Sequence, residues 1–364
     1  MGGSIAFVGI VVLAVILLLR WRKQKIVSSL GENPPTSSDI PISIIPEGRN
    51  AESSTASSEE TAPILPPLPE KFEDYFGLSG VSMKKWNLEN GKSHRELLSP
   101  TSRRYGLALD LFRYVDGDGL IDAITAVHGV INPNVASNFR SHRKLLEKRL
   151  ENDPTLFRKD NWKAGKSGDL REWVMLQFGE IAKRFSWNSV EDHVPVIPVV
   201  HGTDASVAWK ILDTGFSALS SLDAGYYGRG IYFTSSTQYA LPYYASKSNP
   251  ALLLCLAIPG NVYPAVEGPK DANSLLGTPV KSGYQSHYVL TNKDGMPCPQ
   301  RQEPGTFYDE LVLDQESQVV PVAIIEFSHA KLAPIARAFQ REIVEPKAEA
   351  DSTMPVTREA RLTL

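Results

Sequence analysis

The chain has 364 residues, of which 42% are hydrophobic and 22% charged, and its formal net charge at pH 7 is −3. This length allows two average domains, or one domain with appended segments. Because the charge is nearly balanced and basic residues form only one short cluster, no direct nucleic-acid partner is expected. Two cysteines, Cys255 and Cys298, weakly favour a reducing compartment, although they could still pair with each other.

The first predicted element is a transmembrane anchor with a basic flank, in residues 1–25. Residues 4–19 form an uncharged apolar run that, with the two preceding glycines, is long enough to cross a thin bilayer. A cleaved signal peptide is the alternative, but the positive charges follow the apolar run and no small-residue cleavage site comes after it. The basic cluster on the C-terminal flank places the rest of the chain in the cytoplasm by the positive-inside rule. We therefore expect a single-pass membrane protein.

Two less regular segments follow the predicted anchor. Residues 26–70 are rich in Ser, Pro, Thr and Glu, so they cannot bury enough apolar surface to offset chain entropy, and we expect a disordered linker. Residues 71–98 contain several aromatic side chains at weak helical spacing. We interpret this second segment as an N-terminal extension that packs on the main domain.

Regular patterns begin at about residue 99. Apolar residues at helical spacing predict helices over 103–115, 135–150 and 169–185, with Asp169 as the N-terminal cap of the third. A strand is predicted over 120–131. Short β-like runs separated by loops then occur at 194–201, 230–234, 251–259, 286–290, 309–314 and 319–327. A short helix over 332–342 and a disordered tail to residue 364 complete the chain. Helices first and many strands afterwards predict an α+β domain with a mostly antiparallel core.

Several common enzyme motifs are missing. The segment GRG at 228–230 lacks the third glycine of a dinucleotide fingerprint and precedes a strand instead of a helix. The segment GKS at 165–167 lacks the first glycine of a phosphate-binding loop. No Cys/His set has zinc spacing, and no histidine accompanies a nucleophile elbow. These absences disfavour a Rossmann dehydrogenase, a P-loop enzyme and a zinc enzyme, and we expect no metal.

The remaining polar candidates lie at the ends of β-like runs. His201 closes the run 194–201 and is followed by Gly202, which would let a ligand approach the backbone. Tyr232 lies in GRGIYFT, and Glu310 begins an otherwise apolar strand. Each has an ordinary structural explanation: a hydrogen-bonded strand-end histidine, a core tyrosine or a solvated strand end. None of the three is specific when taken alone.

In their order and spacing, these residues resemble the catalytic domain of the poly(ADP-ribose) polymerase family, the diphtheria-toxin-like ADP-ribosyltransferases with an H-Y-E triad. HGT supplies His201, GRGIYFT supplies Tyr232, and YDELVLDQESQVVPVAIIEF supplies Glu310 together with Gln318. ITAVHGVINPNVASNFRSHRKLLEKR resembles the family's opening strand and helix, and GYQSHYV is similar to its GYDSVVV segment. The resemblance covers residues 99–331.

The resemblance implies an ADP-ribosyltransferase fold and transfer of ADP-ribose from NAD⁺, the co-substrate, to protein acceptors with release of nicotinamide. Such cleavage passes through an oxocarbenium-like state. By resemblance, Glu310 contacts the nicotinamide-ribose 2′-OH and stabilises that cationic state. Gly202 would hold the carboxamide through its backbone, and His201 the adenosine ribose. Tyr232 and Tyr243 would enclose the nicotinamide ring.

Further features bear on activity. Thr203 keeps its place after the glycine in the predicted NAD⁺ site, and residues 217–227 would form the loop over the donor. The family often has a serine that bonds the carboxamide where this chain has Ala240, which puts the donor affinity in doubt. The region before residue 99 is too short for a large helical regulatory domain, and no zinc fingers are present. We therefore favour mono-transfer over poly-transfer.

Two other functions stay open. One is a catalytically weak or inactive membrane-tethered module that binds NAD⁺ or ADP-ribosylated partners, which Ala240 motivates. The other is an NAD⁺ glycohydrolase, in which water takes the place of the protein acceptor.

Overall fold

The computed structural model of the protein describes residues 65, 71–72, 92–157, 161–163, 167–185, 187–188, 194–216 and 225–344, the last few of these by their backbone alone. The predicted membrane anchor, the predicted linker apart from residue 65, most of the predicted extension and the predicted tail after residue 344 lie outside the described residues. Within the described part, no helix combines the length and apolar character needed to span a bilayer.

A five-stranded antiparallel sheet is the larger of two sheets in the described residues. Its order is β1 (His94–Leu97), β2 (Ile124–Ile131), β9 (Val319–Phe327), β5 (Pro250–Ala257) and β3 (Ile197–Asp204). Strand β5 is buried along its whole length, because side chains on its two faces enter two different apolar clusters. This explains why its sequence is a continuous apolar run and not an alternating one.

The second sheet of the described residues has four strands. Its order is β4 (Ile231–Phe233), β8 (Tyr308–Leu313), β7 (Ser286–Thr291) and β6 (Val262–Ala265), with the β6–β7 pair parallel and the other pairs antiparallel. A single antiparallel bridge between Val200 and Thr234 joins the two sheets where β3 passes the end of β4. The prediction of an α+β fold with a mostly antiparallel core is confirmed.

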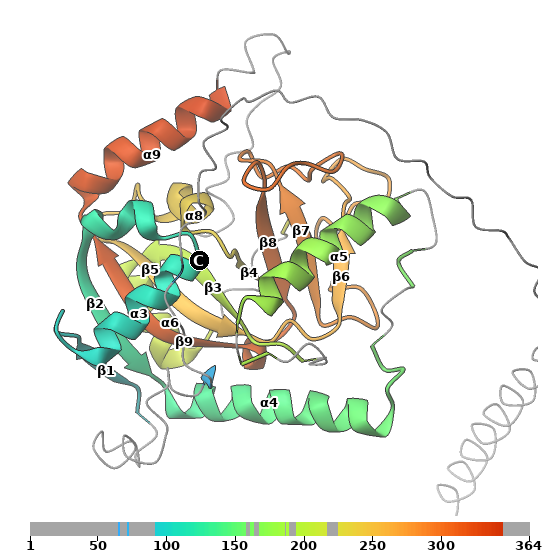
Figure 1. Ribbon diagram of the computed structural model, residues 1–364, viewed down its shortest axis with the longest axis horizontal. Coiled ribbons are helices and arrows are strands. Elements are labelled where there is room, and N and C mark those ends of the chain that lie inside the picture. The colour runs from blue at the N-terminus through green and yellow to red at the C-terminus, as the bar shows by residue number, and fades with distance from the viewer. Residues whose placement is uncertain are drawn as a thin grey trace, which may run out of the picture. The chain divides into compact units, whose positions relative to one another are not determined.

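Helices cover both faces of the larger sheet (Figure 1). On one face pack α3 (Arg103–Tyr114), α4 (Pro133–Asn152) and α8 (Thr237–Tyr244). On the other face lies α6 (Ala205–Thr214), in the apolar cluster that also contains α5 (Gly168–Lys183) and part of the smaller sheet. The C-terminal helix α9 (His329–Val344) contacts α8 and the 3-10 helix η3 (Asp118–Ala123), and a second 3-10 turn, η4 (Glu316–Gln318), precedes β9. This arrangement brings α8 and both sheets together at one place.

Three local predictions are wrong. The strand predicted over 120–131 begins only at Ile124, because the residues before it form η3. Asp169 does not cap α5: the helix begins at Gly168, so Asp169 lies in its first turn, where a carboxylate still complements the helix dipole. His201 does not close its strand, since β3 continues to Asp204. Strands β1 and β6 and helices α6 and α8 were not predicted at all.

The described parts of the predicted extension pack on the main domain. Phe72 is buried and meets Phe139 of α4 edge to face, with ring centroids 6.2 Å apart. Strand β1 pairs with β2 at the edge of the larger sheet.

Cys255 and Cys298 are buried free thiols and do not pair with each other. Burial raises the pKa of both, to about 12 for Cys298.

Candidate active site

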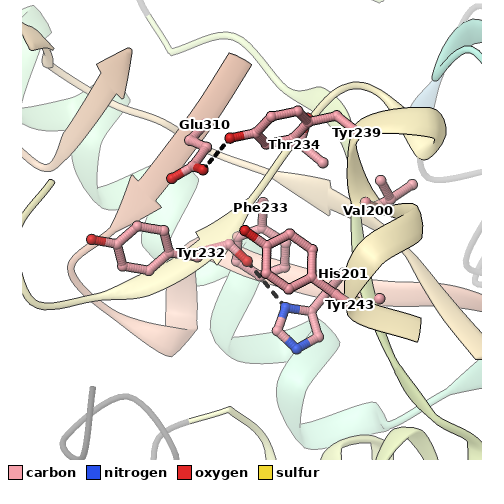
Figure 2. A pocket seen from close by; sticks show the side chains of 10 residues that line it. Val200, His201, Tyr232, Phe233, Thr234, Tyr239, Tyr243 and Glu310 are labelled. Carbon is pink, nitrogen blue, oxygen red and sulfur yellow. Dashed lines mark hydrogen bonds between the residues drawn. The ribbon is translucent and has the colours of Figure 1, made fainter. Parts of the chain in front are cut away.

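A pocket lies where β3, β4, β8 and α8 meet (Figure 2). It is an open cleft whose empty volume is ≈ 390 Å³ when the solvent space at its mouth is included. The residues that line it are Val200, His201, Gly202, Tyr232, Phe233, Thr234, Tyr239, Ala240, Tyr243 and Glu310.

Strand β3 presents backbone hydrogen-bonding groups to this pocket. It is the last strand of its sheet in the described residues, and it pairs with β5 on one side. On the other side the Val200 N–H donates to the Thr234 carbonyl at 2.8 Å, and the Thr234 N–H donates to the Val200 carbonyl at 3.3 Å. Backbone groups two residues apart in a strand point to the same side. The N–H and C=O of Gly202 therefore point away from β5, to the side of β3 on which Thr234 lies, and Gly202 lines the pocket there, so that these groups can hold an amide of a ligand.

Gly202 is also the point at which α8 approaches β3. A Cβ at this position would lie 2.6 Å from Cδ1 of Tyr244 and 3.3 Å from the carbonyl oxygen of Ala240. The glycine therefore allows the helix to pack close to the strand. Because α8 also carries Tyr239 and Tyr243, this close approach sets the width of the pocket.

His201 has a fixed tautomer. Its Nδ1 lies 3.0 Å from the carbonyl oxygen of Tyr232, and since a carbonyl only accepts, Nδ1 must carry the proton. The ring meets Phe216 edge to face at 5.4 Å and Phe233 at 5.7 Å. Burial among these groups lowers the pKa of His201, so the ring is neutral and its Nε2 is a hydrogen-bond acceptor.

Two tyrosine rings stand on opposite sides of the pocket. The hydroxyl of Tyr232 accepts from the Tyr227 N–H at 2.9 Å and donates to the Gly228 carbonyl at 2.7 Å, which fixes the ring against the preceding loop. Tyr243 comes from α8, one turn after Ala240. Figure 2 shows the rings of Tyr232 and Tyr243 on either side of a space below the carboxylate of Glu310. A flat aromatic ligand matches such a space.

Glu310 lies inside β8 and is only 3% exposed. The ordinary explanation of this residue as a solvated strand end is therefore excluded. The hydroxyl of Tyr239 donates to Oε1 of Glu310. The Tyr239 ring in turn stacks on Tyr308, with centroids 5.3 Å apart and an interplanar angle of 21°. Glu310 lies two residues from Val312, the pairing partner of Tyr232, so the two side chains share one face of the smaller sheet.

Two residues whose hydrogen bonds hold the site in place were not identified from the sequence. Tyr239 holds the carboxylate of Glu310, and its place next to Ala240 in the sequence was the available signal. Asp309, on the opposite face of β8 from Glu310, accepts from the Thr234 hydroxyl and the Ser235 N–H, both at 2.8 Å. Burial raises the pKa of Asp309. Its contacts hold the segment between β4 and α8 against β8, but nothing in its sequence position distinguished it from Glu310.

The pocket brings together six of the seven residues named from the sequence. His201, Gly202, Tyr232, Ala240, Tyr243 and Glu310 line it, whereas Thr203 is buried but is not among the lining residues. Of the predicted donor loop, residues 217–224 lie outside the described residues. In the part of the chain that the structure describes, no cluster of His, Cys, Asp or Glu could hold a metal ion. No protein-family model matches the chain, and no curated protein does.

Proposed function

We propose that this domain is an NAD⁺-dependent ADP-ribosyltransferase of the H-Y-E type, which transfers ADP-ribose to protein acceptors and releases nicotinamide. The observation that carries the proposal is the convergence, in one pocket, of a buried carboxylate, two facing tyrosine rings and the edge of a strand. These groups come from β3, β4, β8 and α8. The resemblance of their sequence segments to the poly(ADP-ribose) polymerase family points to the same chemistry.

In this proposal, the nicotinamide ring lies between Tyr232 and Tyr243. Its carboxamide pairs with the N–H and C=O of Gly202, which β3 directs to the pocket. Neutral His201 offers Nε2 as an acceptor to a hydroxyl of the adenosine ribose. These contacts would fix the donor in one orientation, and fixed geometry lowers the barrier to reaction.

Glu310 is the proposed catalytic residue. Breaking the bond between nicotinamide and ribose leaves positive charge on the ribose, and the carboxylate stabilises that charge. The hydroxyl of Tyr239 holds the carboxylate in place. In the transfer step, the acceptor's nucleophilic atom forms the new bond to the ribose carbon and loses its proton, with Glu310 as the base at hand.

The test uses the full-length chain in detergent, with NAD⁺ labelled in its adenylate part and a cell lysate as the acceptor source. Label on protein that disappears with Glu310→Gln supports transfer of ADP-ribose. Free ADP-ribose as the main product would show instead that water is the acceptor and that the enzyme is a glycohydrolase. The attached label is then released from the protein and separated by size. Single units of ADP-ribose would support the favoured mono-transfer, and chains would support poly-transfer.

A binding module without chemistry is the second candidate function. Ala240 favours it, because this residue lines the pocket without a hydroxyl to hold the carboxamide. Thermal stabilisation of the chain by NAD⁺ without any release of nicotinamide would support this candidate, and turnover would exclude it.

We also propose that residues 1–25 anchor the domain to a membrane with the domain in the cytoplasm. This proposal rests on the sequence of that segment. Protease added to sealed microsomes should digest the domain, and protection of the domain would refute the topology.

A further inference from the structure

A fully buried histidine lies close to the pocket but is not one of its lining residues. His287 is on β7 and is fully buried. Its Nδ1 lies 2.6 Å from the carbonyl oxygen of Tyr227, and its Nε2 accepts the backbone N–H of Lys281 at 2.8 Å. A carbonyl only accepts and an N–H only donates, so Nδ1 must carry the proton and Nε2 must not. Both ring nitrogens are therefore committed to backbone groups.

One of these backbone groups leads directly to the pocket. The residue whose carbonyl His287 holds, Tyr227, donates its own N–H to the hydroxyl of Tyr232 at 2.9 Å. That hydroxyl donates to the Gly228 carbonyl at 2.7 Å. Tyr227 is thus held by His287 through its carbonyl, and it holds Tyr232 through its amide. The ring of Tyr232 lines the pocket, whereas His287 does not touch it.

The loop is shaped to accept the imidazole. Gly228 has a φ of +104°, a conformation that side chains with a Cβ rarely adopt. A Cβ at this position would also lie 2.9 Å from Nδ1 of His287. The glycine therefore serves both the turn and the close contact with the ring. A residue that filled space in the core without a further role would not need such a match.

The surroundings of His287 keep its ring neutral. Burial lowers the pKa of the imidazole, and Lys281 lowers it further, while the hydrogen bond to the Tyr227 carbonyl and the charges of Glu267 and Asp314 act in the opposite direction. Glu267 is itself paired with Arg171 of α5.

We propose that His287 is a positioning residue for Tyr232: through the Tyr227 carbonyl it holds the turn that places the Tyr232 ring against the nicotinamide end of NAD⁺. The identity of this ligand rests on the proposed function, whereas the bracing of the turn does not. Without the Nδ1 donor, the Tyr227 amide would separate more often from the Tyr232 hydroxyl, and the ring would lose its fixed orientation. The expected consequence is weaker binding of the donor and not a slower chemical step.

Two substitutions of His287 distinguish its hydrogen bond to the Tyr227 carbonyl from simple filling of space in the core. In His287→Asn, the side-chain N–H₂ can take the place of Nδ1 and still donate to the Tyr227 carbonyl. In His287→Gln, the longer side chain reaches the position of Nε2, so that its oxygen can accept from Lys281 while the Tyr227 contact is lost. Both variants replace an aromatic ring with an amide and should lose stability to a similar extent, which thermal unfolding would measure. The matched control is His142→Gln on α4, where the histidine contacts Ser317 away from the pocket.

The first readout is hydrogen exchange of the Tyr227 amide in the full-length chain without ligand. The amide should exchange about tenfold faster in His287→Gln than in wild type, as expected when one neutral hydrogen bond is lost, and it should stay within about threefold of wild type in His287→Asn. The second readout is nicotinamide release, in which His287→Gln should raise KM for NAD⁺ about tenfold while kcat changes less than about threefold. The His142→Gln control should match wild type in both.

The outcomes distinguish the two proposals. Equal exchange and equal KM in the Asn and Gln variants would overturn the bracing role, because loss of packing alone affects both alike. If the wild-type chain neither binds nor consumes NAD⁺, the proposed function fails, and the exchange of the Tyr227 amide still decides whether His287 positions Tyr232.

Discussion

Replacing Gly202 with alanine should damage the pocket through helix α8. The new Cβ would lie 2.6 Å from Cδ1 of Tyr244, whereas unbonded carbons settle at about 3.5–4.0 Å. Tyr244 is fully buried and its ring packs against Phe327 at 5.4 Å, so it has no open space to enter. Helix α8 must then move by about 1 Å, at a cost of about 1–3 kcal/mol for overpacking a core. Because α8 carries Ala240 and other lining residues, a shift of this size should lower kcat/KM for NAD⁺ about 100-fold.

The assay combines urea unfolding with nicotinamide release from NAD⁺. Gly106→Ala in α3 and Gly179→Ala in α5 are the controls, because a Cβ at either position meets nothing within 4 Å. These two changes should stabilise the protein by about 0.5–1 kcal/mol and leave turnover unchanged. If Gly202→Ala unfolds at the same urea concentration as wild type and keeps its KM, the packing of α8 on β3 does not set the pocket.

Three further changes test individual groups. Tyr239→Phe removes the donor to Glu310, and a hydrogen bond to a charged group is worth about 1.5–3 kcal/mol. The kcat should therefore fall about tenfold to 100-fold, while NAD⁺ affinity measured by calorimetry stays the same. An unchanged kcat would contradict the role of Tyr239. Ala240→Ser adds a hydroxyl at the pocket wall and should lower KM for NAD⁺ by about twofold to tenfold, whereas a higher KM would show that the carboxamide lies elsewhere. The pKa of His287 is lowered by burial, so below about pH 6.5 the unfolded chain binds a proton that the folded chain excludes, and the free energy of unfolding falls as the pH falls. In urea titrations the free energy of unfolding of His287→Asn should fall less steeply with falling pH than that of wild type, because the variant lacks the imidazole. The raised pKa of Asp309 acts in the opposite direction, but it affects both proteins equally. An equal slope in the two proteins would refute a buried neutral ring.

The sequence allowed the fold class and the long elements to be predicted, because these depend on local periodicity. The runs that became β5 and β9 were recognisable as continuous apolar segments, and helices α4 and α5 by their apolar stripes. Short elements were not predicted, and the reason is physical. Helix α8 begins at Thr237 and contains Pro242, so its pattern is too short and too irregular to indicate a helix. Its position depends instead on tertiary contacts, such as the backbone bond from the Thr237 N–H to the Val115 carbonyl at 2.8 Å.

Residues of the candidate site could be grouped from the sequence where their order within known segments was enough. The contacts that hold them in place could not be predicted. The order of His201, Tyr232 and Glu310 within their segments was enough to group them. Gly202 was predicted to let a ligand approach the backbone, but it also accommodates Tyr244 on a helix that was not predicted. The support that Tyr239 gives to Glu310 requires α8 to lie over β8, and such a contact between distant segments leaves no periodic signal in the chain.

In the proposed function, Glu310 stabilises positive charge on the ribose of NAD⁺. The most direct test measures nicotinamide release by the full-length chain and by Glu310→Gln, which keeps an oxygen for Tyr239 and removes the charge. The variant is expected to bind NAD⁺ within about threefold of wild type and to release nicotinamide about 100-fold to 1,000-fold more slowly, as when a buried stabilising group is lost from an active site. Equal rates of nicotinamide release by the two proteins would contradict the account.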